Sequence, residues 1–370
     1  MITRVLIIGG YGNFGSFIAK MLAREDNIQL IIAGRNEDKA QSFAKGLEAK
    51  HKAETAIVDI NHILSESLST IKPHVVIHTS GPYQNQSYHV AEACIAQGCH
   101  YADLADAREF VAGITELDAQ AKEKGVLICS GASSVPCLTA SIIDKYKGEF
   151  HKLEKVEYAI ATAQLTNRGL ATIRAVLSYA GKPFTTLIDG KMQNVYGWMD
   201  LTWRRFWKLN LRPLGNCDIP DLELFPKRYP DLETIRFRAG LELKILHLIL
   251  VSLSGLVRIK LLPSIQPLSR LLLRISFLFD SIGKDDSGFY MLLSGKDESG
   301  NDKYIQFDLV ARHGDGLCIP SVPAIILAKK LANGEIDKTG ATPCIDLITM
   351  DEYLDVLSEF DIEWQTTYPN

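Results

Sequence analysis

A glycine-rich turn near the start of the chain restricts the fold more than any other feature of the sequence. Gly10, Gly12 and Gly15 have the spacing G-x-G-x-x-G, directly after the apolar run 4–9 and directly before an amphipathic run, 14–24. A strand, a tight glycine turn and a helix in this order are typical of the first unit of a dinucleotide-binding Rossmann domain. The pattern therefore predicts that a pyrophosphate binds at the N-terminus of the helix that follows.

The rest of the N-terminal third alternates short apolar runs with longer amphipathic ones. Such alternation indicates parallel βαβ units with right-handed crossovers. Further strands are predicted at 29–33, 55–59, 74–78, 100–104 and 126–130, and helices at 37–50, 63–71, 86–97 and 109–124. The expected fold class is α/β, with an N-terminal doubly wound parallel sheet of the Rossmann type and a second, α+β domain.

The pattern changes after residue 130, where longer segments with partial alternation indicate a largely antiparallel sheet. Strands are predicted at 155–163, 192–196, 234–243, 289–294 and 304–311, the last two as a hairpin, and helices at 137–146 and 169–179. We expect a dinucleotide-binding domain over 1–134 and a substrate or dimerisation domain over 135–320. Two C-terminal helices, 322–331 and 350–360, are expected to bring residues 321–370 back onto the first domain.

The end of the second predicted strand selects the cofactor. NAD enzymes usually place an acid there for the ribose hydroxyls, whereas this chain has Ala33-Gly34-Arg35-Asn36. An arginine can pair with the 2′-phosphate of NADP(H), which an acid would repel. Asp59 either lies beside the adenine or caps its own loop. The predicted cofactor contacts are Gly10, Gly12, Asn13, Phe14, Gly15, Arg35, Asn36, Asp59, Ser80 and Gly81.

Three later loops follow predicted strands, where ligands bind in sheets of this type. They are Thr79–Tyr83, Asp103–Asp106 and Ser130–Ser134. Tyr83 and Asp103 are the leading candidates for acid–base catalysis at the nicotinamide, since each can exchange a proton and each follows a middle strand. Two alternatives remain open at this stage: Asp103 as a structural cap, and Tyr83 as a wall against which the nicotinamide or the substrate stacks.

Several segments together resemble the saccharopine dehydrogenase-like oxidoreductases. They are Val5–Gly15, Gly81–Gln86, His100–Asp106, Ser130–Pro136, Arg168–Ile173, Pro220–Leu222 and Ala239–Leu243. The resemblance implies an NADP-binding Rossmann domain, an α+β second domain and a C-terminal return to the first. The patterns at 81–86 and 101–106 set this chain apart from the saccharopine reductases of lysine metabolism, which bind substrate carboxylates through a basic cluster. Arg168, Arg174, Arg204 and Arg205 are the candidates for such a cluster here.

Composition excludes other classes of function. The net charge of −4 gives no support for nucleic-acid binding. Seven cysteines without a C-x-x-C pair indicate neither a metal site nor a disulfide framework, so we expect reduced thiols in a cytoplasmic protein. No signal peptide is visible, and no Tyr-x-x-x-Lys pair of the short-chain dehydrogenases occurs.

The segment 241–279 is rich in leucine and isoleucine and contains Pro263 and Pro267. We expect two helices broken at these prolines, the second with Arg270 and Arg274 on one face. Three interpretations stay open: packing on its own domain, contact with a second subunit in a homodimer, and peripheral contact with a membrane.

The sequence thus predicts an NADP(H)-dependent oxidoreductase that transfers hydride to or from a C=N or C=O carbon of a small substrate. The alternative is a non-catalytic NADPH-binding protein, either a redox sensor or a membrane-associated scaffold.

Overall fold

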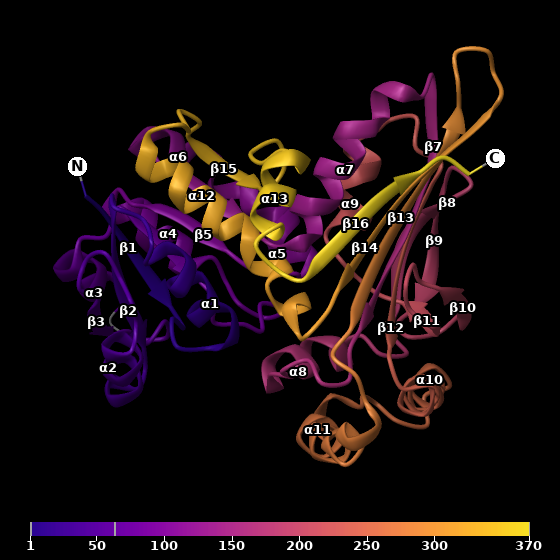
Figure 1. Cartoon of the computed structure of the whole chain (residues 1–370), viewed down its shortest axis with the longest axis horizontal. Helices are drawn as coiled ribbons and strands as arrows, with labels where there is room; N and C mark the ends of the chain where they lie inside the picture. The colour runs from indigo at the N-terminus through magenta and orange to yellow at the C-terminus, as the bar shows by residue number, and fades with distance from the viewer. Residues whose placement is uncertain (1, 63, 370) are drawn as a thin grey trace. The chain divides into compact units, whose positions relative to one another are not determined.

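The computed structural model describes residues 2–62 and 64–369, which form two compact units. The first unit comprises Met1–Ser141 and Cys318–Val356, and the second comprises Ile142–Leu317 and Leu357–Asn370. Both units are therefore discontinuous, and the second segment of the first unit follows the long segment 142–317 of the second unit in the chain (Figure 1).

The first unit is built on a seven-stranded parallel sheet with the order β15-β6-β5-β4-β1-β2-β3. In its central strands the runs Val5–Ile8, Leu30–Ile32 and Val75–Ile77 are buried, as strands covered on both faces require. The strands are β1 (Thr3–Ile8), β2 (Ile28–Gly34), β3 (Glu54–Ile57), β4 (Val75–His78), β5 (His100–Asp103), β6 (Leu127–Ser130) and β15 (Gly340–Pro343). The predicted Rossmann sheet is confirmed, with one strand more than the sequence indicated.

Helices cover the sheet of the first unit on both faces. One face, including Leu6, Ile31 and Val76, packs against helices α3, α4 and α6 in a single apolar cluster. Helices α1 and α12 contact each other and the strands β1, β4 and β5. The helices are α1 (Asn13–Leu22), α2 (Glu37–Lys45), α3 (Leu64–Ile71), α4 (His89–Gln97), α5 (Arg108–Gly113), α6 (Asp118–Lys124), α12 (Val322–Asn333) and α13 (Met350–Leu357).

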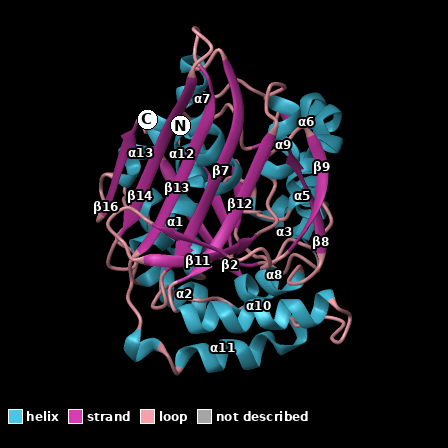
Figure 2. Ribbon diagram, turned by 90° about the vertical axis from the view of Figure 1, so that its right-hand side faces the viewer, coloured by secondary structure: helices cyan, strands magenta, loops and turns pink. Residues whose placement is uncertain are grey.

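The second unit contains a mixed seven-stranded sheet with the order β10-β11-β12-β7-β13-β14-β16. All neighbours in it are antiparallel except β12 and β7, and Figure 2 shows the long strands side by side. The strands are β7 (Lys152–Thr162), β10 (Thr202–Arg205), β11 (Leu211–Asn216), β12 (Thr234–Leu241), β13 (Ser287–Lys296), β14 (Asp302–Ala311) and β16 (Ile362–Thr367), with a separate hairpin of β8 (Pro183–Ile188) and β9 (Lys191–Tyr196). The predicted hairpin around residues 297–302 joins β13 to β14.

The C-terminal residues divide between the two units. The helices predicted at 322–331 and 350–360 correspond to α12 and α13, which belong to the first unit except for the last residue of α13, whereas β16 pairs with β14 of the second sheet. Helix α12 and strand β15 do join the first unit, where Lys329 forms an ion pair with Glu25 and Asn27 donates a hydrogen bond to Asn333. The chain therefore crosses between the units again at residue 357.

Five more helices lie between residues 139 and 277. Helix α7 (Thr139–Tyr146) contains the boundary between the units, and α8 (Leu170–Ser178), α9 (Asp221–Arg228), α10 (Lys244–Arg258) and α11 (Ser269–Phe277) belong to the second unit. Helices α10 and α11 are the predicted pair, separated by a linker that contains Pro263 and Pro267.

The structure describes the state of the cysteines, of metal-ligating side chains and of the apolar helices. All seven cysteines are buried and free. Among the described residues, no group of three His, Cys, Asp or Glu side chains is arranged to hold a metal ion. None of the helices in the described part of the chain has the length and apolar character needed to cross a bilayer.

Candidate functional site

The glycine turn after β1 is held by backbone hydrogen bonds. The Gly9 and Gly10 amides donate to the Ala33 carbonyl oxygen at the end of β2, over 2.9 and 3.1 Å, and the Gly12 amide donates to the Gly9 oxygen over 2.8 Å. Gly9 has a φ of +82°, a left-handed conformation that glycine adopts without strain. The turn therefore bends the chain sharply from β1 into α1.

Two of the three motif glycines are required by close backbone contacts. A Cβ atom at Gly15 would lie 2.3 Å from the Gly9 oxygen, and one at Gly10 would lie 2.9 Å from the Ile7 oxygen. Gly12 differs, because its backbone is extended (φ −79°, ψ 177°), it is exposed, and a Cβ there would lie 3.1 Å from the Gly9 oxygen. Gly10 and Gly15 thus serve packing, whereas Gly12 presents bare backbone to solvent.

Helix α1 begins at this bare backbone. Its N-cap residue, Gly12, has no side chain that could accept hydrogen bonds from the first turn, and the first turn, which includes Asn13 and Phe14, contains no acidic residue. A helix N-terminus left in this state favours an anion through its amide groups and its dipole. The glycine turn and the first residues of α1, residues 9–15, therefore form a cradle of backbone amides that fits the pyrophosphate of a dinucleotide.

The loop between β2 and α2 is fixed by a residue that the sequence analysis did not single out. The ring of Tyr11 lies over Gly34, where a Cβ would come within 2.5 Å of the Tyr11 hydroxyl. That hydroxyl accepts a hydrogen bond from the Asn36 amide over 3.0 Å. The Asn36 side chain in turn caps α2 by accepting from the Lys39 amide over 2.9 Å. A tyrosine between two motif glycines, facing a glycine at the end of the next strand, is the signal that was missed.

Arg35 lies within this fixed loop, but its side chain does not take part in the contacts that hold the loop. It is exposed, and its guanidinium has no ion pair or hydrogen bond with any described residue. The nearest acidic residues in the sequence, Glu37 and Asp38, lie in the first turn of α2. A rigid backbone with an unpaired guanidinium is preorganised to bind a phosphate group.

The remaining predicted cofactor contacts lie along the same edge of the sheet. Asp59 accepts a hydrogen bond from the Asn61 amide over 3.0 Å, so it caps its own loop, and a contact with adenine stays a prediction. After β4, the Thr79 hydroxyl donates to the Ile8 oxygen over 2.9 Å and lies with Ser80 directly against Gly9. The loop that contains Gly81 is therefore joined to the glycine turn.

Tyr83 is buried inside the first unit. Its hydroxyl donates to the His78 carbonyl oxygen over 2.7 Å, and its ring packs edge-on against the imidazole of His78. Burial raises the pKa of this phenol well above its ordinary value. His78 is itself fully buried, lies 3.1 Å from the Tyr101 hydroxyl, and burial lowers its pKa to about 3, so the imidazole is neutral.

Asp103 is also fully buried, at the end of β5. Its Oδ1 atom accepts three hydrogen bonds: from the Ala105 amide over 2.9 Å, the Gly131 amide over 2.9 Å and the Ser130 hydroxyl over 3.0 Å. Burial raises the pKa of this carboxyl to about 6, against the lowering effect of these bonds. Asp103 therefore connects the loop after β5 to the loop after β6.

Tyr83 and Asp103, the candidates for acid–base catalysis, are both buried and hydrogen-bonded within the first unit. The strand ends are nevertheless brought together as predicted, since β4, β5 and β6 are neighbours in the sheet. Buried His78 and Tyr101 belong to the same polar group and were missed. A role for Tyr83 or Asp103 in proton transfer stays a prediction.

The basic residues considered in the second domain are divided among separate contacts. Arg168 forms an ion pair with Asp280 over 2.6 Å, and the guanidinium of Arg204 lies 3.6 Å from the centre of the Tyr290 ring. Arg174 is partly buried on α8, and Arg205 is exposed on β10. Within the second unit these four arginines do not form a single cluster.

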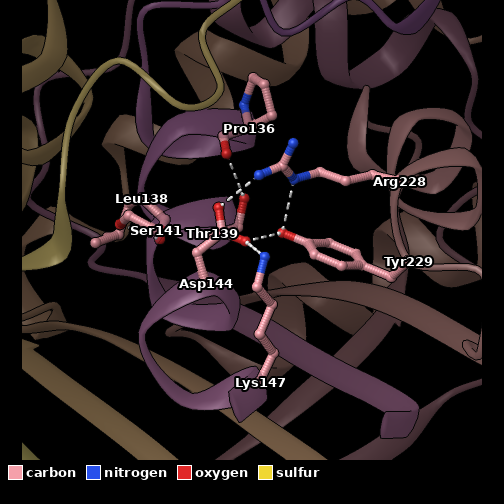
Figure 3. Close-up of polar contacts among 8 residues, drawn as sticks. All are labelled: Pro136, Leu138, Thr139, Ser141, Asp144, Lys147, Arg228 and Tyr229. Atoms are coloured by element: carbon pink, nitrogen blue, oxygen red, sulfur yellow. Dashed lines mark hydrogen bonds and ion pairs between the residues drawn. The ribbon is translucent and has the colours of Figure 1, made fainter. Parts of the chain in front are cut away.

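A second group of polar side chains, also missed, connects α7 with α9. Figure 3 shows that Lys147, Arg228 and Tyr229 converge on Asp144. The Asp144 carboxylate accepts from Lys147 over 2.8 Å, from Arg228 over 2.9 Å and from the Tyr229 hydroxyl over 3.1 Å. Because each charge in this group is paired, the cluster stabilises the contact between the two helices.

Comparisons with known proteins agree with this geometry. Residues 5–129 match the family model described as the saccharopine dehydrogenase NADP binding domain. A search of curated proteins finds no matching sequence. The match confirms the resemblance inferred from the sequence, and it confirms NADP as the cofactor of the first domain.

One solved structure shows the same fold over the whole chain. Apo saccharopine dehydrogenase (L-Glu forming) from Saccharomyces cerevisiae matches with a TM-score of 0.75 and 14% identity, covering 100% of both chains. A dehydrogenase from Clostridium difficile matches with a TM-score of 0.42 and 8% identity, covering 96% of this chain and 97% of that chain. The first of these matches shows that both units, and not only the cofactor domain, have the architecture of that protein.

Proposed function

We propose that this chain transfers hydride between NADP(H) and a C=N or C=O carbon of a small substrate. It is an NADP-dependent oxidoreductase with a cofactor domain of the saccharopine dehydrogenase type. The observation that carries the proposal is the cradle at residues 9–15 together with the unpaired Arg35. When bound, NADPH supplies the hydride from its nicotinamide ring.

The residues of the first unit would divide the cofactor between them. Gly12 and the first turn of α1 would hold the pyrophosphate, and Arg35 would pair with the 2′-phosphate. Thr79 and Asp103 would fix the loops after β4, β5 and β6, which lie on the nicotinamide side of sheets with this strand order. Asp103 acts in this scheme as a positioning residue, because its carboxylate binds two loops and is not exposed.

Removing the charge of Arg35 is expected to abolish the preference for NADPH. We expect Arg35→Ala to weaken NADPH binding about tenfold to a hundredfold, because a charge-assisted pair is lost, and to leave NADH binding unchanged. Arg35→Asp should reverse the preference, since a carboxylate repels the 2′-phosphate. Dissociation constants for both cofactors, measured by nicotinamide fluorescence, test this.

The matched control is Lys45→Ala, which removes an exposed positive charge from the far end of the neighbouring helix α2. It should change neither affinity. Equal affinities of the natural protein for NADPH and NADH would contradict the assignment of Arg35 to the 2′-phosphate.

Hydride transfer itself is tested by isotope labelling. The protein is incubated with NADPH deuterated at C4 and with a panel of aldehydes, keto acids and imines formed from keto acids and amines. We expect deuterium at the carbonyl or imine carbon of one class of product, found by mass spectrometry. Tyr83→Phe in the same assay should leave turnover nearly unchanged if this buried phenol is structural, and abolish it if the phenol relays a proton.

The alternative is a protein that binds NADPH without catalysis, as a redox sensor or a scaffold. Tight NADPH binding with no deuterium transfer to any member of the panel would favour it. NADPH binding without label transfer therefore supports the assignment of the cofactor site only. Transfer of the deuterium label is needed to support the proposed reaction.

A further inference from the structure

Helices α10 and α11 lie side by side at one end of the second unit (Figures 1 and 2). Both helices carry exposed aliphatic side chains. Of the 20 large hydrophobic side chains that are exposed in the described chain, 12 fall between residues 245 and 282. They include Leu278, which is 78% exposed, and Leu261, which is 69% exposed. Soluble monomers rarely present an apolar surface of this extent unless it meets a partner or a membrane.

Helix α10 presents aliphatic residues to solvent, while its buried face mixes the polar His247 and Ser254 with the apolar Leu250 and Val257. His247 and Ser254 are fully buried against the second unit, whereas Ile245 and Ile249 are half exposed. The exposed positions 245, 249, 252, 256 and 259 follow a helical repeat, so they form one stripe along the helix, aliphatic except for Ser252. Because the outer face of a surface helix is normally polar, this aliphatic stripe points to an apolar medium outside the helix.

Specific contacts fix both helices in this orientation. Gly181 packs so closely on α10 that a Cβ there would lie 2.2 Å from the Ser254 oxygen. The Gln164 side chain donates to the Ser276 oxygen at the end of α11 over 2.8 Å. The exposed stripe is therefore part of the folded structure of the second unit.

The charge around the stripe has one sign. Residues 243–279 contain five basic side chains and no acidic one, in a chain whose net charge is −4. Arg270 and Arg274 lie on α11 next to the exposed aliphatic positions 271, 275 and 278. The acidic residues that flank the segment, Glu242 and Asp280, are engaged in ion pairs with Arg212 and Arg168.

We propose that this α10–α11 surface, residues 244–279, binds the surface of anionic phospholipid bilayers. An aliphatic stripe bordered by Arg and Lys is typical of helices that lie in the membrane interface, with the apolar face in the acyl region and the basic side chains among the headgroups. A second copy of this chain fits less well, because a symmetric dimer through the same patch would bring like charges together. The segment also lacks the Tyr, Trp and Met residues that protein interfaces favour.

Vesicle flotation tests the proposal with the full chain. We expect it to bind vesicles of phosphatidylcholine with phosphatidylserine, and not vesicles of phosphatidylcholine alone. The variant Leu271→Gln, Ile275→Gln, Leu278→Gln should weaken binding at least about a hundredfold, because three insertable side chains are lost. The variant Arg270→Gln, Arg274→Gln should weaken it about tenfold, and so should a higher salt concentration.

A matched control removes three exposed apolar side chains elsewhere in the second unit: Met192→Gln, Leu201→Gln, Leu211→Gln. It should bind vesicles as the natural protein does. All variants change exposed positions, and unchanged circular dichroism and NADPH affinity would show that they fold.

Three results would overturn the proposal. They are no binding of the natural protein to anionic vesicles, full binding by the triple leucine–isoleucine variant, and loss of binding in the matched control. A dimer in light scattering that the triple variant dissociates, without any vesicle binding, would assign the surface to a second copy. None of these outcomes depends on whether hydride transfer is found.

Discussion

Replacement of Gly12 by valine is expected to weaken NADPH binding at least about a hundredfold while the protein still folds, because the pyrophosphate loses charge-assisted bonds to the helix N-terminus. Gly12 has an extended backbone that any residue adopts, and it is exposed, so a side chain there requires only a small shift of the Gly9 oxygen, which would lie 3.1 Å from the added Cβ. The valine methyl groups would occupy the space in which the phosphates approach the first turn of α1. Titration of NADPH fluorescence and thermal unfolding measure the two effects.

Two further glycine variants serve as controls for the loss of NADPH binding, one expected to be neutral and one expected to unfold the first unit. Gly148→Ala adds a Cβ in open space in the second unit and should change neither binding nor stability. Gly15→Val should unfold the first unit, because its Cβ would lie 2.3 Å from the Gly9 oxygen. Normal NADPH binding by the Gly12 variant would show that the dinucleotide binds elsewhere.

Asp103→Ala is expected to destabilise the protein by about 3 kcal/mol, because two buried amides and one buried hydroxyl lose their acceptor together. The groups are the Ala105 and Gly131 amides and the Ser130 hydroxyl. Denaturant unfolding of the natural protein and the variant measures the difference. An unchanged free energy of unfolding would show that the loops after β5 and β6 hold their conformation without this carboxylate.

Asp103→Asn keeps an acceptor oxygen but cannot ionise, which separates hydrogen bonding from charge. Burial raises the pKa of Asp103 from 3.8 to about 6. A carboxyl with a raised pKa binds its proton more tightly in the folded state, so its charge destabilises the natural protein as the pH rises from about 4 to about 6. The stability of the Asn variant relative to the natural protein should therefore increase by about 2 kcal/mol between about pH 4.5 and pH 7.5. A difference that does not change with pH would contradict the raised pKa.

The parts of the fold that depend on local patterns are predictable from the sequence. The glycine spacing and the buried Val and Ile runs of β1, β2 and β4 are each contained within a few residues, and the structure has these strands within two residues of their predicted bounds. The same holds for β12, β13 and β14, whereas β7 begins three residues before its predicted start at 155. The alternation in these strands reflects one face in the core.

The parts that depend on distant pairing are not predictable in this way. Gly340–Pro343 has no apolar period, and it forms β15 only because Leu127 to Ser130 provide a free edge more than 200 positions earlier in the chain. Helix 109–124 was predicted as one piece, but Gly113 and a short 3-10 turn, Ile114–Leu117, interrupt it. Tertiary contacts decide such details.

In the candidate site, too, local patterns were predictable from the sequence and contacts between distant residues were not. The strand ends that bear Tyr83 and Asp103 follow from the βαβ pattern, but the direction of each side chain does not. His78 and Tyr101 turn the ends of β4 and β5 into a buried polar group, and a sequence shows them only as polar residues in apolar runs. The role of Tyr11 was not predicted, because the residue that its ring contacts, Gly34, lies on the next strand.

The discontinuity of the first unit has a consequence during synthesis of the protein. Strand β15 and helix α12 leave the ribosome only after about 180 residues of the second unit have been made, so the cofactor domain waits incomplete while its neighbour is translated. During that interval β6 is an unpaired edge, which other strands can join. A premature stop anywhere before residue 340 removes β15 and leaves β6 permanently at the edge of the Rossmann sheet.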